Sequence, residues 1–275
     1  MIAALLITLR EGLEAVLIVG IVLSLLYRLG ARDRALAVWG GTAAAVLVSV
    51  IAGTALLILG WRLEGTAEEI FEGTIMLIAA GLLTWMIFWM QGQGSKLQQH
   101  LEEETRIAAR HNGWWGLFVL AFIAVVREGI ETALFLTAAA FQADGQQVIL
   151  GGLLGLGIAI GIGWLLFSAG RRISIRLFFQ VTGILLLLVA AGLLAHGVHE
   201  LQEAGLLPTF IDTLWNINPI LDENGPLGSF LKALFGYNGN PSLLEVIVYT
   251  LYLLVVGYRA IRAWGIEPVR SARRI

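Results

Sequence analysis

Two stretches of this chain decide its fold: IAALLITLREGLEAVLIVGIVLSLLY at residues 2–27 and WWGLFVLAFIAVVREGIETALFLTAAAF at residues 114–141. Each is a continuous apolar run longer than the roughly 20 residues that a helix needs to cross about 30 Å of hydrocarbon. Each also carries a charged pentapeptide in its middle, Arg10-Glu11-Gly12-Leu13-Glu14 in the first and Arg127-Glu128-Gly129-Ile130-Glu131 in the second. Charged side chains at this depth are costly, so they indicate a functional site.

The composition of the whole chain agrees with a membrane environment. Of its 275 residues 58% are hydrophobic and 14% are charged, and the mean hydropathy of +0.82 is too high for an ordinary soluble domain. We therefore expect an all-α integral membrane protein, with lipid as its solvent and residues 1–275 forming a single transmembrane domain. The apolar runs predict seven transmembrane helices, at Ile2–Tyr27, Ala35–Leu59, Thr66–Met90, Trp114–Phe141, Gln147–Ala169, Leu177–Glu200 and Leu243–Ala263.

Lysine and arginine residues are distributed unevenly between the two sides that this topology defines. Of the 18, 14 fall on one side, two lie inside helices, and only Arg62 and Lys232 fall on the other side. Loops rich in lysine and arginine remain in the cytoplasm. We therefore expect a protein of the inner (cytoplasmic) membrane, with its amino terminus outside and its carboxyl terminus on the cytoplasmic side. No basic arm is present to bind nucleic acid.

The chain also repeats itself. Ala79-Ala80-Gly81-Leu82-Leu83 recurs as Ala190-Ala191-Gly192-Leu193-Leu194, 111 residues later, and the charged pentapeptide recurs 117 residues later. Each unit then holds three helices, and an odd number of crossings inverts the second copy relative to the first. We expect repeat 1 at about 1–92, repeat 2 at about 113–203, an extracytoplasmic loop at about 204–241 and a last helix at about 242–264.

The two pentapeptides predict a metal site near the middle of the bilayer. At 1.5 Å per residue, Glu11 and Glu128 lie roughly 15 to 20 Å deep and enter from opposite faces. A spacing of three or four residues lets the arginine and both glutamates of each pentapeptide project from one helix face. The expected ligands are Glu11, Glu14, Glu128 and Glu131, with Arg10 and Arg127 balancing part of their charge.

Carboxylate oxygens suit a hard cation such as Fe²⁺, Fe³⁺, Mn²⁺ or Ca²⁺, and a chain without cysteine offers no thiolate ligand. The four glutamates and two arginines, all ionised, carry a net charge of −2, which a divalent ion balances. Fe³⁺ calls for one more carboxylate, and Glu72 is the candidate. The alternative is that each pentapeptide forms a salt bridge that holds helices together. Two symmetric copies with excess negative charge favour the cation site.

A second group of candidate ligands lies at the outer ends of two predicted helices. We expect it to be an outer site where the cation first binds, formed by Glu68, Glu69, Glu72, His196, His199 and Glu200. Their spacings of three and four residues let each set share a helix face. Simpler explanations exist for most of them, because acids favour the start of a helix and histidines favour the membrane interface.

The doubled pentapeptide, together with Glu68-Glu69-Ile70-Phe71-Glu72-Gly73, resembles the high-affinity iron permeases of the oxidase-dependent type, and the bacterial branch most closely. The resemblance covers nearly the whole chain. It implies import of Fe³⁺ or Fe²⁺ across the cytoplasmic membrane, with the four pentapeptide glutamates as ion ligands. It further implies periplasmic iron-binding and peroxidase-like proteins as partners. Iron would be the transported substrate, and no cofactor is expected.

Two other functions fit parts of the sequence. Lead permeases share the pentapeptides, so Pb²⁺ or Mn²⁺ is an alternative cargo. A membrane-embedded metalloenzyme could use buried glutamates as di-metal ligands, but such sites carry Glu-x-x-His pairs, and no histidine accompanies the pentapeptides. The inverted repeat also favours transport, so we do not expect an enzyme.

Overall fold

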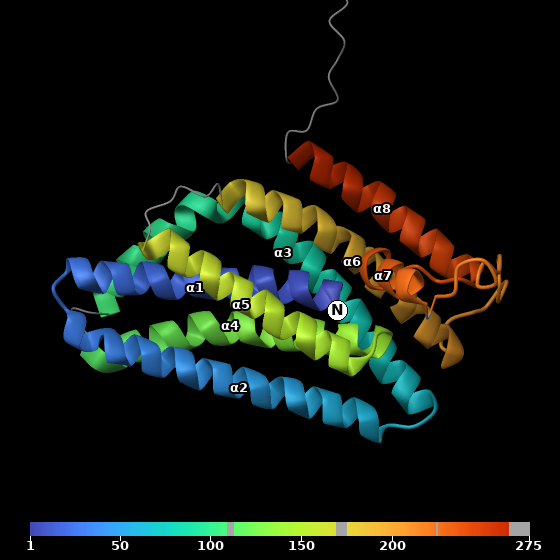
Figure 1. Ribbon diagram of the computed structural model, residues 1–275, viewed down its shortest axis with the longest axis horizontal. Coiled ribbons are helices and arrows are strands. Elements are labelled where there is room, and N and C mark those ends of the chain that lie inside the picture. The colour runs from blue at the N-terminus through green and yellow to red at the C-terminus, as the bar shows by residue number, and fades with distance from the viewer. Residues whose placement is uncertain (109–112, 169–174, 224, 264–275) are drawn as a thin grey trace, which may run out of the picture.

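The structure is a computed structural model, and it describes residues 1–108, 113–168, 175–223 and 225–263. These residues form helices and connecting loops, with no strand among them (Figure 1). The helices are α1 Ile2–Arg28, the short 3₁₀ helix η1 Arg32–Arg34, α2 Ala35–Arg62, α3 Thr66–Ile107, α4 Gly113–Gln142, α5 Gly145–Ser168, α6 Ile175–Glu203, α7 Pro226–Phe235 and α8 Leu243–Ala263.

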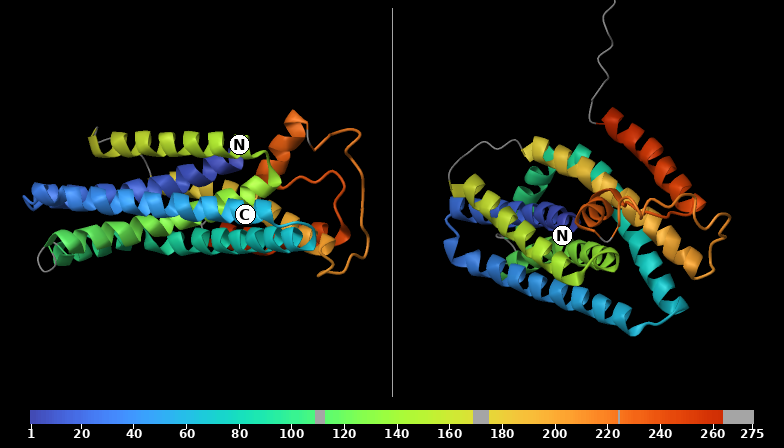
Figure 2. Two further views of the ribbon diagram at one scale, coloured as in Figure 1. Left: turned by 90° about the horizontal axis from the view of Figure 1, so that it is seen from below. Right: turned by 45° about the vertical axis from the view of Figure 1, so that its right-hand side comes forward.

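The long helices lie roughly along one direction, as Figure 2 shows in its left view. Five segments are long and apolar enough to cross a membrane, within α2, α3, α5, α6 and α8. Helices α1 and α4 have 27 and 30 residues, and they carry the charged pentapeptides. The prediction of an all-α, multi-pass membrane protein is confirmed.

Helices that are distant in sequence pack against each other in pairs. The most extensive contacts join α1 to α5, α2 to α4 and α3 to α6, and α1 also packs along α4. Figure 1 shows α1 beside α5 and α2 beside α4, with α8 on the outer side of α6. Because α1 and α4 contact each other, the two pentapeptides meet inside the bundle.

Two parts of the fold differ from the sequence prediction. Helix α3 continues to Ile107, well past the predicted end of its membrane span at Met90. The expected outer loop contains the short helix α7. Pro226 is pre-organised for the first turn of α7, and Gly236 ends it in the left-handed conformation with φ of 67°.

Helix α8 begins with a capping box formed by Ser242 and Glu245. The Ser242 N–H donates to the Glu245 carboxylate at 2.8 Å, and the Glu245 N–H donates to Ser242 Oγ at 3.2 Å. These bonds satisfy backbone donors that the first turn of a helix otherwise leaves free. Ser242 Oγ also donates to Gln202 Oε1 at 2.7 Å, so the start of α8 lies close to the end of α6.

Candidate metal centre

The pentapeptide glutamates of α1 and α4 converge in the interior of the bundle. Glu11, Glu128 and Glu131 each offer one carboxylate oxygen, and these oxygens lie within 4.8 Å of one another. Glu11 and Glu128 are buried and Glu131 is nearly so. Three carboxylates so close together repel one another, so this arrangement suits a shared positive charge.

Each pentapeptide glycine allows a third helix to approach the centre. A side chain at Gly12 would meet Ala159 on α5 at 3.1 Å, and one at Gly129 would overlap Ser49 on α2. The glycines therefore serve helix packing, and α5 and α2 cover the backs of the two pentapeptides.

Glu14 stands apart from the other three glutamates. Its carboxylate pairs with Arg10 of the same helix at 3.3 Å, and it is absent from the group whose oxygens lie within 4.8 Å. The structure thus brings three of the four predicted ligands together and places Glu14 in an ion pair beside them.

The centre contains buried polar atoms without hydrogen-bond partners among the described protein atoms. These atoms are both carboxylate oxygens of Glu11, Arg10 Nη1, and the two atoms of the Arg10–Glu14 ion pair, Nε and Oε1, which lie close without a hydrogen bond. Most buried polar atoms in proteins are paired, and an unpaired charged group is costly at this depth. The free carboxylate oxygens are the donor set that a hard cation prefers, so the residues fit iron as a bound substrate.

The two arginines occupy different environments. The Arg10 side chain is 2% exposed, and its Nη2 donates to Met90 Sδ at 2.9 Å. The Arg127 side chain is 42% exposed and donates from Nε to Glu131 at 3.1 Å. Sequence reasoning gave both arginines one charge-balancing role and did not predict this difference.

A buried apolar layer separates the centre from the end of the bundle where α3 begins. Ile7 lies one turn before Glu11, Phe135 lies one turn after Glu131, and both side chains are fully buried. Leu83 of α3 and Leu193 of α6 belong to the same cluster. The side chains of this layer offer no oxygen or nitrogen ligand to a cation.

The predicted outer ligands fall into two groups in the structure. Glu72 interacts electrostatically with Glu68 and Glu200, and Glu200 interacts with Glu69. Gly73 permits this arrangement, because a side chain there would lie 3.1 Å from Glu200 Cβ. These four acids form an acidic cluster between α3 and α6, and Glu72 does not join the oxygens of the central site.

The two histidines face α8 and α7 instead. His199 Nδ1 lies 2.9 Å from Glu245 and its Nε2 lies 3.3 Å from Glu203. His196 is buried, and its Nδ1 is 3.1 Å from the Gly192 carbonyl oxygen of its own helix. The expected single outer site is therefore divided: His199 belongs to a network that joins α6 to α8, and an electrostatic interaction with Glu200 connects it to the acidic cluster.

Glu245 is the centre of that network, and the sequence analysis missed it. This buried carboxylate also accepts from Asn238 Nδ2 at 3.0 Å. The Ser-x-x-Glu spacing at residues 242–245 was a readable signal of a helix start. It could not reveal the contact with His199, which depends on how α6 and α8 pack.

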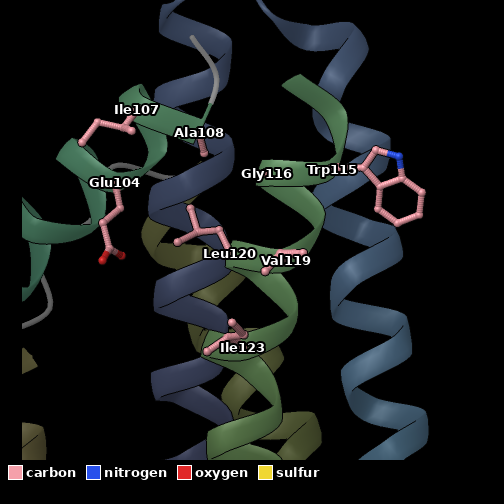
Figure 3. A pocket seen from close by; sticks show the side chains of 8 residues that line it. All are labelled: Glu104, Ile107, Ala108, Trp115, Gly116, Val119, Leu120 and Ile123. Carbon is pink, nitrogen blue, oxygen red and sulfur yellow. The ribbon is translucent and has the colours of Figure 1, made fainter. Parts of the chain in front are cut away.

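Two surface pockets lie away from the pentapeptide glutamates. An apolar groove of about 560 Å³ lies between the end of α3 and the start of α4, and its lining includes Ala108, Leu120 and Ile123 (Figure 3). A polar pocket of about 390 Å³ lies near Met1, Asp144 and Lys232. The apolar lining of the first offers one carboxylate, Glu104, so it does not resemble a cation path.

Fold and site together define a multi-pass membrane protein with a buried carboxylate centre, and comparison with known proteins gives its family. Residues 1–266 match the iron permease FTR1 family. The chain is 35% identical over 276 residues to the ferrous iron permease EfeU of Yersinia pestis, covering 98% of each chain. It is 36% identical over 271 residues to ferrous iron permease EfeU of Shigella sonnei, covering 97% of this chain and 96% of the relative.

The chain belongs to the iron permease FTR1 family. The resemblance drawn from the pentapeptides is thereby confirmed, and so is the prediction of an iron permease. A permease family is consistent with transport rather than catalysis. No solved structure matches the chain.

The α6–α8 network gives a first prediction. Glu245→Ala leaves the polar groups of His199, Asn238 and the Ser242 backbone without their partner, so we expect the free energy of unfolding to fall by roughly 2–3 kcal/mol. Thermal unfolding of the purified protein in detergent measures this. The matched control is Glu203→Ala, which removes the exposed partner of His199 and should change stability by less than about 1 kcal/mol. Equal effects of the two changes would contradict the network.

Proposed function

We propose that this chain imports iron across the cytoplasmic membrane by binding it near the middle of the bilayer. The proposed ligands are the four pentapeptide glutamates, Glu11, Glu14, Glu128 and Glu131. The observation that carries the proposal is the meeting of three carboxylates from α1 and α4 within 4.8 Å, with both oxygens of buried Glu11 unpaired. Glu14 would reach the ion by exchanging its pairing with Arg10.

Seven spans in two inverted repeats are the architecture that we propose for this transport. In such a repeat α1, α2 and α3 correspond to α4, α5 and α6. The contact between α1 and α5 then corresponds to the contact between α4 and α2, and both contacts are extensive. The pairs α1–α4 and α3–α6 each correspond to themselves, as expected around a two-fold axis. This pattern supports the repeat, which places the central site where the two halves meet.

We propose that the amino terminus lies outside and the carboxyl terminus in the cytoplasm, on the basis of the lysine and arginine distribution. The acidic cluster of Glu68, Glu69, Glu72 and Glu200 then lies at the outer face. It would attract iron first, and the apolar layer of Ile7 and Phe135 would have to open before iron reached the centre. This sequence of steps is alternating access around a fixed site.

The ferrous ion is the form of iron that the site favours. Four carboxylates and two guanidinium groups leave two negative charges, which one divalent ion balances. Glu72, which could have supplied the extra carboxylate for Fe³⁺, interacts instead with Glu68 and Glu200. Two of the relatives are named ferrous iron permeases, which supports the same form.

We also infer that periplasmic iron-binding and peroxidase-like proteins deliver the iron, because the family resemblance implies them. Residues 204–241 are the part of the chain that would face such proteins. Another metal, such as Mn²⁺ or Pb²⁺, stays an alternative cargo, and competition by these ions during iron uptake would distinguish them.

The central site gives the second prediction. Glutamine keeps the shape of glutamate and one oxygen, but it removes the charge. We therefore expect Glu11→Gln, Glu128→Gln or Glu131→Gln to reduce uptake of radioactive iron into vesicles at least tenfold, with each variant folded. The matched control is Glu203→Gln, an exposed glutamate that should transport normally. If the three variants unfolded and Arg10→Gln did too, the pentapeptides would be structural salt bridges.

The acidic cluster gives the third prediction. Glu72→Gln removes one charge from the outer face and leaves the central site intact. We expect the iron concentration for half-maximal uptake to rise about threefold to tenfold while the maximal rate stays near that of the unchanged protein. Because His199 contacts α8, replacing it by glutamine should leave this concentration nearly unchanged. Normal uptake by Glu72→Gln at limiting iron would refute a role for the cluster in uptake.

A further inference from the structure

One short segment of α3 contacts the arginines of both pentapeptides. The Arg127 guanidinium lies over the indole ring of Trp89, 4.9 Å from its centroid, and 6.0 Å from that of Trp85. The next residue, Met90, accepts the hydrogen bond from Arg10 Nη2 at 2.9 Å. Residues 85–90 of α3 therefore contact both arginines beside the central carboxylates, although none of these residues contributes a carboxylate to the site.

Arg127 lies at the middle of the 30-residue helix α4, and 42% of its side chain is exposed. A guanidinium at this depth is costly unless another group covers it. The two indole rings cover one side of it. They also support each other, because they are stacked with centroids 6.1 Å apart and an angle of 29° between their planes. A cation over a tryptophan face is attracted by the ring, and most strongly where water is excluded.

The position of the guanidinium determines which carboxylates are free. Arg127 Nε lies 3.1 Å from Glu131 and 4.0 Å from Glu128. Both oxygens of Glu11 lack a hydrogen-bond partner among the described residues. If the guanidinium left the indole rings and moved inward, it would come closer to Glu128, could reach Glu11, and would compete with a cation for their oxygens.

We propose that Trp89, supported by Trp85, is a positioning residue of the metal centre that acts through Arg127. It holds the guanidinium beside Glu131, so that the oxygens of Glu11 stay available to iron. This proposal rests on the proposed function, because it takes the pentapeptide carboxylates as the iron site. It adds a determinant of iron affinity that is neither acidic nor a ligand.

The test is equilibrium binding of Fe²⁺, measured by anaerobic titration calorimetry on the purified full-length protein in detergent. We expect Trp89→Leu to raise the dissociation constant on the order of fivefold, because it removes the ring that holds the guanidinium. Trp89→Phe keeps a weaker aromatic face and should raise it about twofold. Trp39→Leu, an exposed tryptophan of α2, is the matched control and should bind as the unchanged protein does.

The decisive comparison places the same change in a protein that lacks the guanidinium. In an Arg127→Gln background, Trp89→Leu should leave the dissociation constant unchanged, because no group remains for the ring to hold. A role in packing alone predicts the opposite result, with the same loss in both backgrounds. If Trp89→Leu does not accumulate as folded protein, Trp89→Phe with and without Arg127→Gln gives the same comparison.

Three results would overturn the proposal. These are unchanged binding in both Trp89 variants, equal loss with and without Arg127, or loss of binding by Arg127→Gln alone. Failure of the central site itself would look different. In that case Glu131→Gln would bind Fe²⁺ as tightly as the unchanged protein does, whatever the Trp89 variants show.

Discussion

Mutual repulsion among carboxylates in the interior of the bundle is the constraint on which the rest of the structure depends. Glu11, Glu128 and Glu131 approach within 4.8 Å in surroundings that exclude most water. Such a group is tolerated only where positive charge is near, and the chain supplies two arginines for four glutamates. The remaining imbalance of two charges is what a divalent cation would correct, so the same constraint explains the arginines and supports the proposed binding of iron.

The packing of the helices keeps these charges in place. Contact between α1 and α4 brings the pentapeptides together, while Gly12 and Gly129 let α5 and α2 close behind them. The apolar layer around Phe135 then separates the centre from the acidic cluster of α3 and α6. The transport proposed here requires this layer to open and close between the two sites.

The sequence predicted the all-helical fold and the pentapeptide glutamates that meet between α1 and α4, because both depend on local signals. Long apolar runs define the spans, and an acid inside such a run is conspicuous. It did not predict the division of the outer cluster, since His199 and Glu200 are neighbours in sequence but face α8 and α3 respectively. The contact of Trp89 with Arg127 was hidden for the same reason. Contacts of this kind depend on how helices cross, and spacing within one helix does not encode that.

The central claim is that iron binds between the two pentapeptides, and locating the ion tests it most directly. Crystals of the purified protein grown with Fe²⁺ and measured at the iron absorption edge would show the metal by its anomalous scattering. We expect a peak within bonding distance of carboxylate oxygens from Glu11, Glu128 and Glu131. A peak found solely at the acidic cluster of Glu72 and Glu200, with the pentapeptide carboxylates paired to their arginines, would contradict it.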